Sequence, residues 1–151
     1  MIITHGMIDV GNKDITVRLA KAEGNIKLGD DAFGVIKNGT CIKGDVLATA
    51  KIAAIQAVKS TPSMIPLCHS ILIEAVKVEF AILEEDSSVS VTVTVKSSGK
   101  TGVEMEALAG AGIGCLTIYD MLKYTGKAMV ISQIKLLEKT GGKSGNYKRQ
   151  N

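Results

Sequence analysis

The stretch ILIEAVKVEFAILEEDSSVSVTVTVK, residues 71–96, alternates apolar and polar side chains in two runs. Apolar side chains stand at every second position from 76 to 82 and again from 89 to 95. A period of two is typical of strands, because successive side chains point to opposite faces of a sheet. The short connector EEDS therefore predicts an antiparallel hairpin of strands over 71–83 and 88–96, with one face buried and the other polar.

The segments before this hairpin predict one more strand and two helices. The mixed segment 15–28 predicts a strand, and DDAFGVIKN at 30–38 predicts a short helix closed by an Asn-Gly pair. The segment 45–59 is rich in alanine and straight-chain residues and starts with an aspartate suited to an N-cap. It predicts a longer helix that stops before Pro62.

The segments after the hairpin complete the pattern. The longest helical stretch covers 103–127 and is expected to end at Gly126, and a last strand is expected over 128–139. The order strand, helices, hairpin, helix, strand is typical of α+β proteins. We therefore expect a ferredoxin-like sandwich, in which helices pack on one face of a mostly antiparallel sheet.

The composition narrows the class of protein. With 46% of its 151 residues hydrophobic, the chain is expected to form one domain over 1–151, with 141–151 as a mobile tail. A net charge of +3, from 18 basic and 15 acidic side chains, is too small to indicate a nucleic-acid partner. No run approaches the roughly 18 apolar residues that a membrane span needs, so we expect no membrane partner and a cytoplasmic location.

The cysteines and histidines are too few and too scattered for a disulfide framework or a zinc site. Cys41, Cys68 and Cys115 are odd in number and far apart, which predicts reduced thiols. No paired His or Cys spacing of the kind that holds zinc is present, so no metal site is expected. His69 follows Pro66 in an apolar stretch, where a hydrogen-bonded structural histidine is more common than a catalyst.

Two glycine-lysine segments, SSGKTG at 97–102 and TGGKSG at 140–145, invite comparison with phosphate-binding loops. The full loop pattern would need glycine where Thr94 and Leu137 stand, so a nucleotide hydrolase is a minority reading. Phosphate capture by Lys100 and the N-terminus of the following helix is still possible. A flexible polar turn is an equally weighted alternative.

Charged side chains mark both ends of the long helix. Asp120 and Lys123 are three residues apart and share one helix face. They could form an exposed ion pair of little consequence, or a covered pair with shifted pKa values, because the surrounding turn IYDML is apolar. Glu104 and Glu106 lie in the first turn, where the helix dipole favours carboxylates whatever their function.

The spacing within this helix points to an assembly. Glu106 and Asp120 are fourteen residues apart, about 21 Å along a helix, so one small pocket cannot hold both. They serve one ligand only if it is elongated or if two subunits build the site. The helix 45–59 is apolar around most of its circumference, which favours cover by a second subunit. The glycines of 109–114 would permit close packing at such a junction or on the chain's own sheet.

Four segments together resemble one known family. KGDVLATAKIAAIQAVKST, IPLCHSILI, KTGVEMEALAGAGIGCLTIYDMLK and LLEKTGGKSG are similar to the characteristic segments of the MoaC family, the cyclic pyranopterin monophosphate synthases. The resemblance runs from about Ile8 to the tail. Ser70 stands where the family usually has proline, Ser60 where arginine is frequent and Thr140 where serine is common.

The resemblance implies an enzyme of molybdenum cofactor biosynthesis. Its substrate would be cyclised dihydro-GTP, supplied from GTP by an upstream radical enzyme, and its products cyclic pyranopterin monophosphate and pyrophosphate, which makes it a lyase. No redox cofactor is implied, and Mg²⁺ is possible with the triphosphate. The implied assembly is a homohexamer, a trimer of dimers, with the site at the dimer interface.

The resemblance also implies residue roles. It assigns the catalytic aspartate to Asp120 and acid/base lysines to Lys123 and Lys43. Residues implied to contact the substrate are Leu67, Cys68, His69, Met105 and Glu106, and basic residues implied to meet the triphosphate are Arg18, Lys59, Lys139 and Lys143. Two alternatives stay open on the residues alone: a non-catalytic module that binds a nucleotide or pterin phosphate, and an oligomeric scaffold protein, which would leave the polar motifs unexplained.

Overall fold

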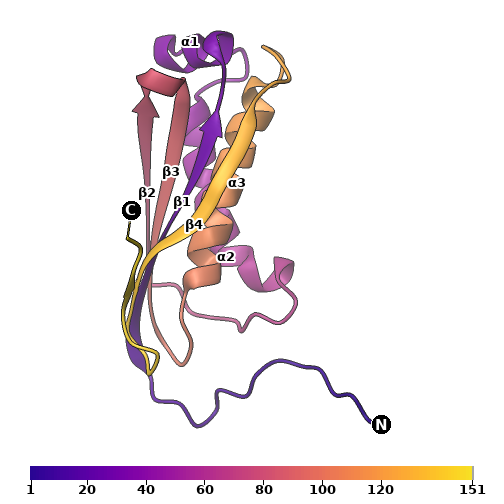
Figure 1. The fold of residues 1–151 in the computed structure, drawn as a ribbon, viewed down its shortest axis with the longest axis vertical. Helices are drawn as coiled ribbons and strands as arrows, with labels where there is room; N and C mark the ends of the chain where they lie inside the picture. Colours follow the sequence, from indigo (N-terminus) through magenta and orange to yellow (C-terminus); the bar gives the residue numbers. More distant parts are fainter. Residues whose placement is uncertain (151) are drawn as a thin grey trace.

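A computed structural model describes residues 1–150 of the chain (Figure 1). These residues contain five strands and three α-helices, joined by loops. Their order along the chain is β1 (Thr16–Lys27), α1 (Asp30–Asn38), α2 (Val46–Met64), β2 (Ala75–Leu83), β3 (Ser88–Gly99), α3 (Glu104–Leu122), β4 (Val130–Thr140) and β5 (Tyr147–Lys148). Asn151, the last residue of the predicted mobile tail, lies outside the described residues.

The strands form one antiparallel sheet in the order β2-β3-β1-β4-β5. The predicted hairpin is confirmed, since β2 pairs with β3 and Val78 lies opposite Val93. A short turn at Glu84–Asp86, followed by Ser87 with a φ of 52°, reverses the chain between them. This register is strongly specified, because a slip of one residue would turn the buried valines to the other face.

Helices α2 and α3 cover one face of the sheet, and α3 lies along β1, β3 and β4 (Figure 1). The alternate valines of β3, from Val89 to Val95, are fully buried beneath them. On α3, Gly110 faces α2 and β3, and Gly114 lies against Val91 of β3. The glycines therefore serve packing within the chain, and the α+β fold of ferredoxin-like type is confirmed.

The end of α2 differs from the sequence prediction, because the helix continues through Pro62 to Met64. Proline removes one backbone donor, and this loss is tolerable close to a helix end. The Thr61 hydroxyl donates to the Ala57 carbonyl oxygen at 2.9 Å, and the Ile65 amide donates to the Thr61 carbonyl oxygen at 2.9 Å. These two bonds complete the last turn around the proline.

Other boundaries were also predicted incorrectly by a few residues. Helix α3 ends at Leu122 rather than at Gly126, because both the amide and the hydroxyl of Thr125 donate to the Leu122 carbonyl oxygen, at 2.9 and 2.8 Å. Strand β2 begins at Ala75 instead of 71, and the segment before it is loop. The short strand β5 was not predicted; it pairs with β4 through Glu138 opposite Lys148.

Among the described residues, α3 is long and apolar enough to cross a membrane by length and composition alone, contrary to the expectation that no run comes close. In the structure 50% of this stretch is buried, and the helix packs on the sheet and on α2. Such a position is that of the core helix of a folded domain. A helix covered on two sides needs apolar residues around most of its circumference, which is why α3 passes a test of length and composition.

The close packing of α3 leads to a stability prediction. A Cβ atom at Gly110 would lie 2.9 Å from Val58 Cγ2 and 3.3 Å from the Ala54 carbonyl oxygen, whereas one at Gly112 would meet only Ile134 Cδ1, at 3.3 Å. We expect Gly110→Ala to lower the free energy of unfolding by roughly 1 to 3 kcal/mol through overpacking. The matched Gly112→Ala should be neutral or stabilising by up to about 1 kcal/mol. Urea denaturation measures both, and equal effects would contradict the packing argument.

Candidate functional site

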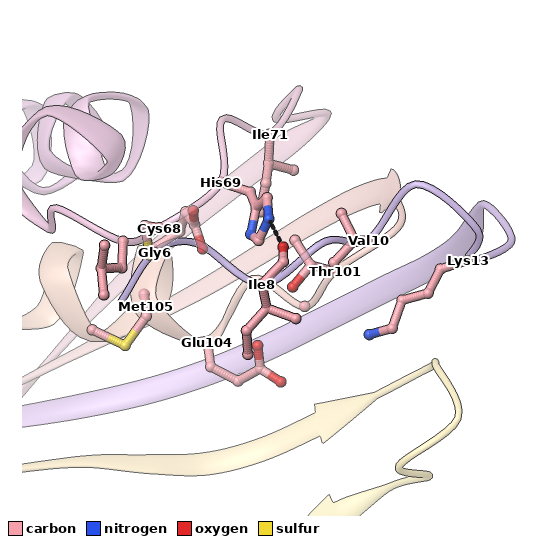
Figure 2. A pocket seen from close by; sticks show the side chains of 13 residues that line it. Gly6, Ile8, Val10, Lys13, Cys68, His69, Ile71, Thr101, Glu104 and Met105 are labelled. Carbon is pink, nitrogen blue, oxygen red and sulfur yellow. Dashed lines mark hydrogen bonds between the residues drawn. The ribbon is translucent and has the colours of Figure 1, made fainter. Parts of the chain in front are cut away.

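A pocket of about 400 Å³ lies at the N-terminal end of α3; it is called the larger pocket below (Figure 2). Three segments build it: the N-terminal segment 6–13, the loop between α2 and β2, and the start of α3. The loop is held on the sheet because the Ser97 hydroxyl donates to the Leu72 carbonyl oxygen at 2.6 Å. The five predicted substrate-contacting residues all line this pocket: Leu67, Cys68, His69, Met105 and Glu106.

Glu106 is the buried acid of the larger pocket. Its side chain is 2% exposed, and among residues 1–150 its Oε1 atom has no hydrogen-bond partner. Burial, with a smaller contribution from the negative charge of Glu104, raises the pKa of the Glu106 carboxyl. Burial and the charge of Glu106 likewise raise the pKa of the Cys68 thiol. Burial therefore disfavours the charged form of this carboxyl group in the pocket.

His69 is hydrogen-bonded, as expected of a structural histidine, and it also lines the larger pocket. Its Nε2 atom lies 2.6 Å from the carbonyl oxygen of Ile8, and Figure 2 shows this bond at the rim of the pocket. Because a carbonyl oxygen only accepts, Nε2 must carry the hydrogen. The ring thus anchors the N-terminal segment and presents its remaining surface to whatever occupies the pocket.

The three predicted catalytic residues meet at the other end of α3. Lys123 Nζ lies 2.6 Å from Asp120 Oδ1, and Lys43 Nζ lies 3.5 Å from Asp120 Oδ2. Lys43 also donates to the Asp120 carbonyl oxygen at 2.9 Å. The loop between α1 and α2 brings Lys43 there, pinned by the Ile42 amide, which donates to the Tyr124 hydroxyl at 3.3 Å.

Hydrogen bonding shifts the pKa values of Asp120 and Lys123 in opposite directions. The hydrogen bond from Lys123 lowers the pKa of the Asp120 carboxyl, and the charges of both lysines lower it further. The same bond raises the pKa of Lys123. The side chains of Asp120 and Lys123 are 57% and 55% exposed, so the apolar turn around them does not cover the pair within one chain. The expectation of cover was wrong at this level, because the apolar neighbours on the helix face the core and the pair faces outward.

A second cavity, of about 170 Å³, adjoins the larger pocket and is called the smaller cavity below. Lys13 lines both. Arg18 lies in the smaller cavity and is only 7% exposed, and its Nε atom donates to the Gly99 carbonyl oxygen at 3.1 Å. Within residues 1–150 Arg18 forms no ion pair, and the buried Thr16 hydroxyl has no partner. A buried cation beside an unsatisfied hydroxyl suits an anionic ligand.

The remaining basic residues divide between this region and the outer surface. Lys143 lines the smaller cavity. Lys139 lines neither space, but its Nζ lies 3.3 Å from Oε1 of Glu104, which lines the larger pocket, and donates to the hydroxyl of Ser144, the neighbour of Lys143, at 2.6 Å. Lys59 is an exposed side chain of α2 that lines neither space. The structure therefore places Arg18 and Lys143 in the smaller cavity and Lys139 beside Glu104 and Ser144, and Lys59 stands apart.

Several lining residues were not singled out from the sequence. Glu104 was attributed to the helix dipole alone, yet it lines the larger pocket. Ile8, Val10 and Lys13 also line it, although MIDVGNK served only as the start of the family resemblance. Nothing in the local pattern reveals that this polar segment folds back over a loop about sixty residues away.

The two clusters are separate within one chain. Helix α3 is continuous from Glu104 to Leu122, so Glu106 and Asp120 are about 21 Å apart along its axis. Within residues 1–150, no three His, Cys, Asp or Glu side chains are grouped to hold a metal ion. The cluster of Asp120, Lys123 and Lys43 and the larger pocket cannot serve one small molecule within a single chain.

The buried acid predicts a stability that depends on pH. A folded-state pKa above the reference value of 4.5 means that the folded state binds more protons between the two values, so stability falls as pH rises. We expect Glu106→Gln to raise the free energy of unfolding by roughly 1 to 2 kcal/mol at pH 8 and to leave it unchanged near pH 4. Urea denaturation at both pH values measures this difference.

A matched control is Glu79→Gln. Glu79 is a surface carboxylate whose pKa is lowered, chiefly by a hydrogen bond from Lys77, so its replacement should give no stabilisation at pH 8. Stabilisation by Glu106→Gln at both pH values would contradict the assigned cause.

The family comparison agrees with this geometry. The model of the MoaC family matches residues 7–142 of the 151 in the chain. The match includes most of the segment at the pocket rim, both ends of α3 and Lys139 of β4, and it ends before Lys143 and β5. With a match over nine-tenths of its length, the chain belongs to the MoaC family, whose members are enzymes of molybdenum cofactor biosynthesis.

Proposed function

We propose that the protein is a lyase that converts cyclised dihydro-GTP into cyclic pyranopterin monophosphate and pyrophosphate. The observation that carries the proposal is the junction of the two spaces. The larger pocket offers apolar walls and a buried acid, and the smaller cavity offers a buried arginine without an ion pair. In a substrate made of a ring system joined to a phosphate chain, the ring matches the larger pocket and the phosphates match the smaller cavity.

The substrate is proposed to bind with its ring in the larger pocket and its phosphates on Arg18, Lys143 and Lys139. Leu67 and Met105 provide apolar contact for the ring, and the buried carboxyl of Glu106, whose Oε1 atom has no partner among residues 1–150, can hydrogen-bond to a ring heteroatom. Because Arg18 is held in place by Gly99, its planar donors are already oriented for phosphate oxygens. The tail glycine Gly142, with a φ of 84°, packs on the guanidinium and helps to bury it.

The acid/base cluster would come from a second subunit. Asp120, Lys123 and Lys43 are too far from Glu106 in their own chain, so the proposed site joins the pocket of one subunit with the cluster of its partner. On α2, the outward Ile52 is 58% exposed, as expected for a face that another copy covers. We propose a hexamer built as a trimer of such dimers.

The proposed chemistry divides between the two clusters. Rearrangement of the purine-derived ring needs proton delivery and removal, and the Lys123 ammonium and the Asp120 carboxylate, 2.6 Å apart, offer a proton donor and a proton acceptor. For the cyclic phosphate, a sugar hydroxyl oxygen bonds to the α-phosphorus and its proton passes to a base. The bond from that phosphorus to the bridging oxygen breaks, and pyrophosphate leaves with this oxygen. Arg18 and the lysines stabilise the charge on the phosphate oxygens.

The cofactor proposals follow from the residues present. No redox cofactor is proposed for this chemistry. The side chains around the smaller cavity are mainly basic and do not make a protein-held Mg²⁺ site, so any Mg²⁺ is proposed to arrive on the triphosphate. We propose a cytoplasmic location, where a radical enzyme that acts on GTP supplies the substrate.

The direct test is incubation of the purified protein with cyclised dihydro-GTP, with Mg²⁺ supplied, followed by mass spectrometry. Formation of both cyclic pyranopterin monophosphate and pyrophosphate would establish the reaction. If the compound binds to an intact oligomer and remains unchanged, the protein is a binding module and the acid/base roles of Asp120 and Lys123 are wrong.

A further inference from the structure

The N-terminal segment forms one wall of the larger pocket without belonging to a helix or strand. Gly6, Ile8, Val10 and Lys13 line the pocket, and the segment runs beside the loop that carries Cys68 and His69 (Figure 2). Apart from the half-buried Val10, the side chains of 6–13 are exposed. A segment that buries so little apolar area gains little hydrophobic stabilisation, so its position depends on its polar contacts with the rest of the fold.

Two side chains from separate loops make such contacts, and both bind main-chain carbonyl oxygens. His69 Nε2 lies 2.6 Å from the oxygen of Ile8, and Lys100 Nζ donates to the oxygen of Gly11 at 2.8 Å. These oxygens are three residues apart on the segment. Two anchors on one short stretch restrict its rotation as well as its distance from the fold.

Lys100 has no other partner that would explain its position. It is half-buried, lines neither the larger pocket nor the smaller cavity, and forms no ion pair with any of residues 1–150. Lys100 binds a turn at residues 9–13 that is stabilised by its own hydrogen bonds. The Gly11 amide donates to Asp9 Oδ1 at 2.8 Å, and the Lys13 amide donates to the Val10 carbonyl oxygen at 3.1 Å. The lysine of SSGKTG therefore points to the chain's own backbone instead of a phosphate.

We propose that Lys100 is a positioning residue that holds segment 6–13 in place as the wall of the larger pocket, and so sets the affinity for the substrate without touching it. The part of this inference that concerns the substrate rests on the proposed function. The part that concerns the segment does not, because the bond from Lys100 to Gly11 exists in the chain without a ligand.

The test is Lys100→Met, which keeps most of the side-chain length and removes the donor. Without the bond to Gly11 the amides of residues 7–13 should exchange hydrogen faster by about tenfold, and KM for cyclised dihydro-GTP should rise about tenfold with kcat changed less than about twofold. Lys100→Arg keeps a charged donor and should restore most of both values. Hydrogen exchange detected by mass spectrometry and steady-state kinetics measure the two effects.

The matched control is Lys77→Met, which removes a surface lysine paired only with Glu79 among residues 1–150 and should leave exchange in 7–13 and KM unchanged. If the native chain forms no product, the proposed function fails, and exchange in 7–13 still tests the anchor. The inference is overturned if Lys100→Met leaves the exchange unchanged, or if exchange rises in an active enzyme with no change in KM.

Discussion

Turnover of cyclised dihydro-GTP is expected to fall by about 10² to 10⁴ in Asp120→Asn and in Lys123→Ala, the range for loss of a positioned acid or base. Asparagine keeps the shape of the aspartate but cannot accept a proton or balance the two lysines. Alanine removes the ammonium group that lies 2.6 Å from Asp120 Oδ1. Single-turnover kinetics measure the rate, and size-exclusion chromatography checks that the oligomer survives.

A suitable control is Lys37→Ala, which removes a surface ion pair that includes none of Asp120, Lys123 and Lys43. Lys37 pairs with Glu84 at 2.9 Å, and both side chains are exposed, as are Asp120 and Lys123. Removal of this pair should leave turnover within about twofold, because exposed ion pairs contribute little to stability. Near-normal activity in Asp120→Asn would refute the catalytic assignment.

Mixed oligomers test whether two subunits build one site. Suppose that Asp120→Asn and Glu106→Gln each abolish activity. A dimer of one Asp120→Asn subunit and one Glu106→Gln subunit then has one site that carries both substitutions and one site that carries neither. Random mixing after reversible unfolding should then recover about a quarter of the native activity. Recovery close to zero would show that both residues act in the same chain, which the 19-residue length of α3 makes difficult.

Arg18→Gln is expected to raise KM about a hundredfold, equivalent to about 2.7 kcal/mol, because phosphate oxygens would lose a charged, preoriented donor. The effect is large because Arg18 is 7% exposed and forms no ion pair with any residue of 1–150. Glutamine can still donate to the Gly99 carbonyl oxygen. Steady-state kinetics and pyrophosphate binding by calorimetry both measure the loss.

The control for this prediction is Arg149→Gln. The side chain of Arg149 is exposed and donates to the Leu136 carbonyl oxygen at 2.8 Å, outside both spaces. Its replacement should change KM by less than about twofold, as is usual for a surface substitution. An equal loss of pyrophosphate affinity in both variants would mean that net charge acts, rather than the smaller cavity.

The sequence was sufficient to predict structure wherever the hydrophobic period was regular, and to predict candidate site residues wherever a long motif was present. The valines at alternate positions of β3 specified the hairpin and its buried face, since the side-chain period of a strand is two. The resemblance to the family predicted the acid/base residues and the substrate-contacting residues, and the structure places these two sets at opposite ends of α3. Element ends were less predictable: Pro62 lies inside α2, because hydrogen bonds of its neighbours outweigh one missing donor.

Only the tertiary structure decided which groups meet. The sequence alone determined the strands, the helices and the candidate side chains, because periodicity, capping and motifs are local properties of the chain. It could not show that Arg18 is buried without an ion pair, that Asp120 faces outward, or that Lys100 binds the oxygen of Gly11. Those facts depend on contacts between segments far apart in the chain, and burial and pKa values follow from such contacts rather than from neighbouring residues.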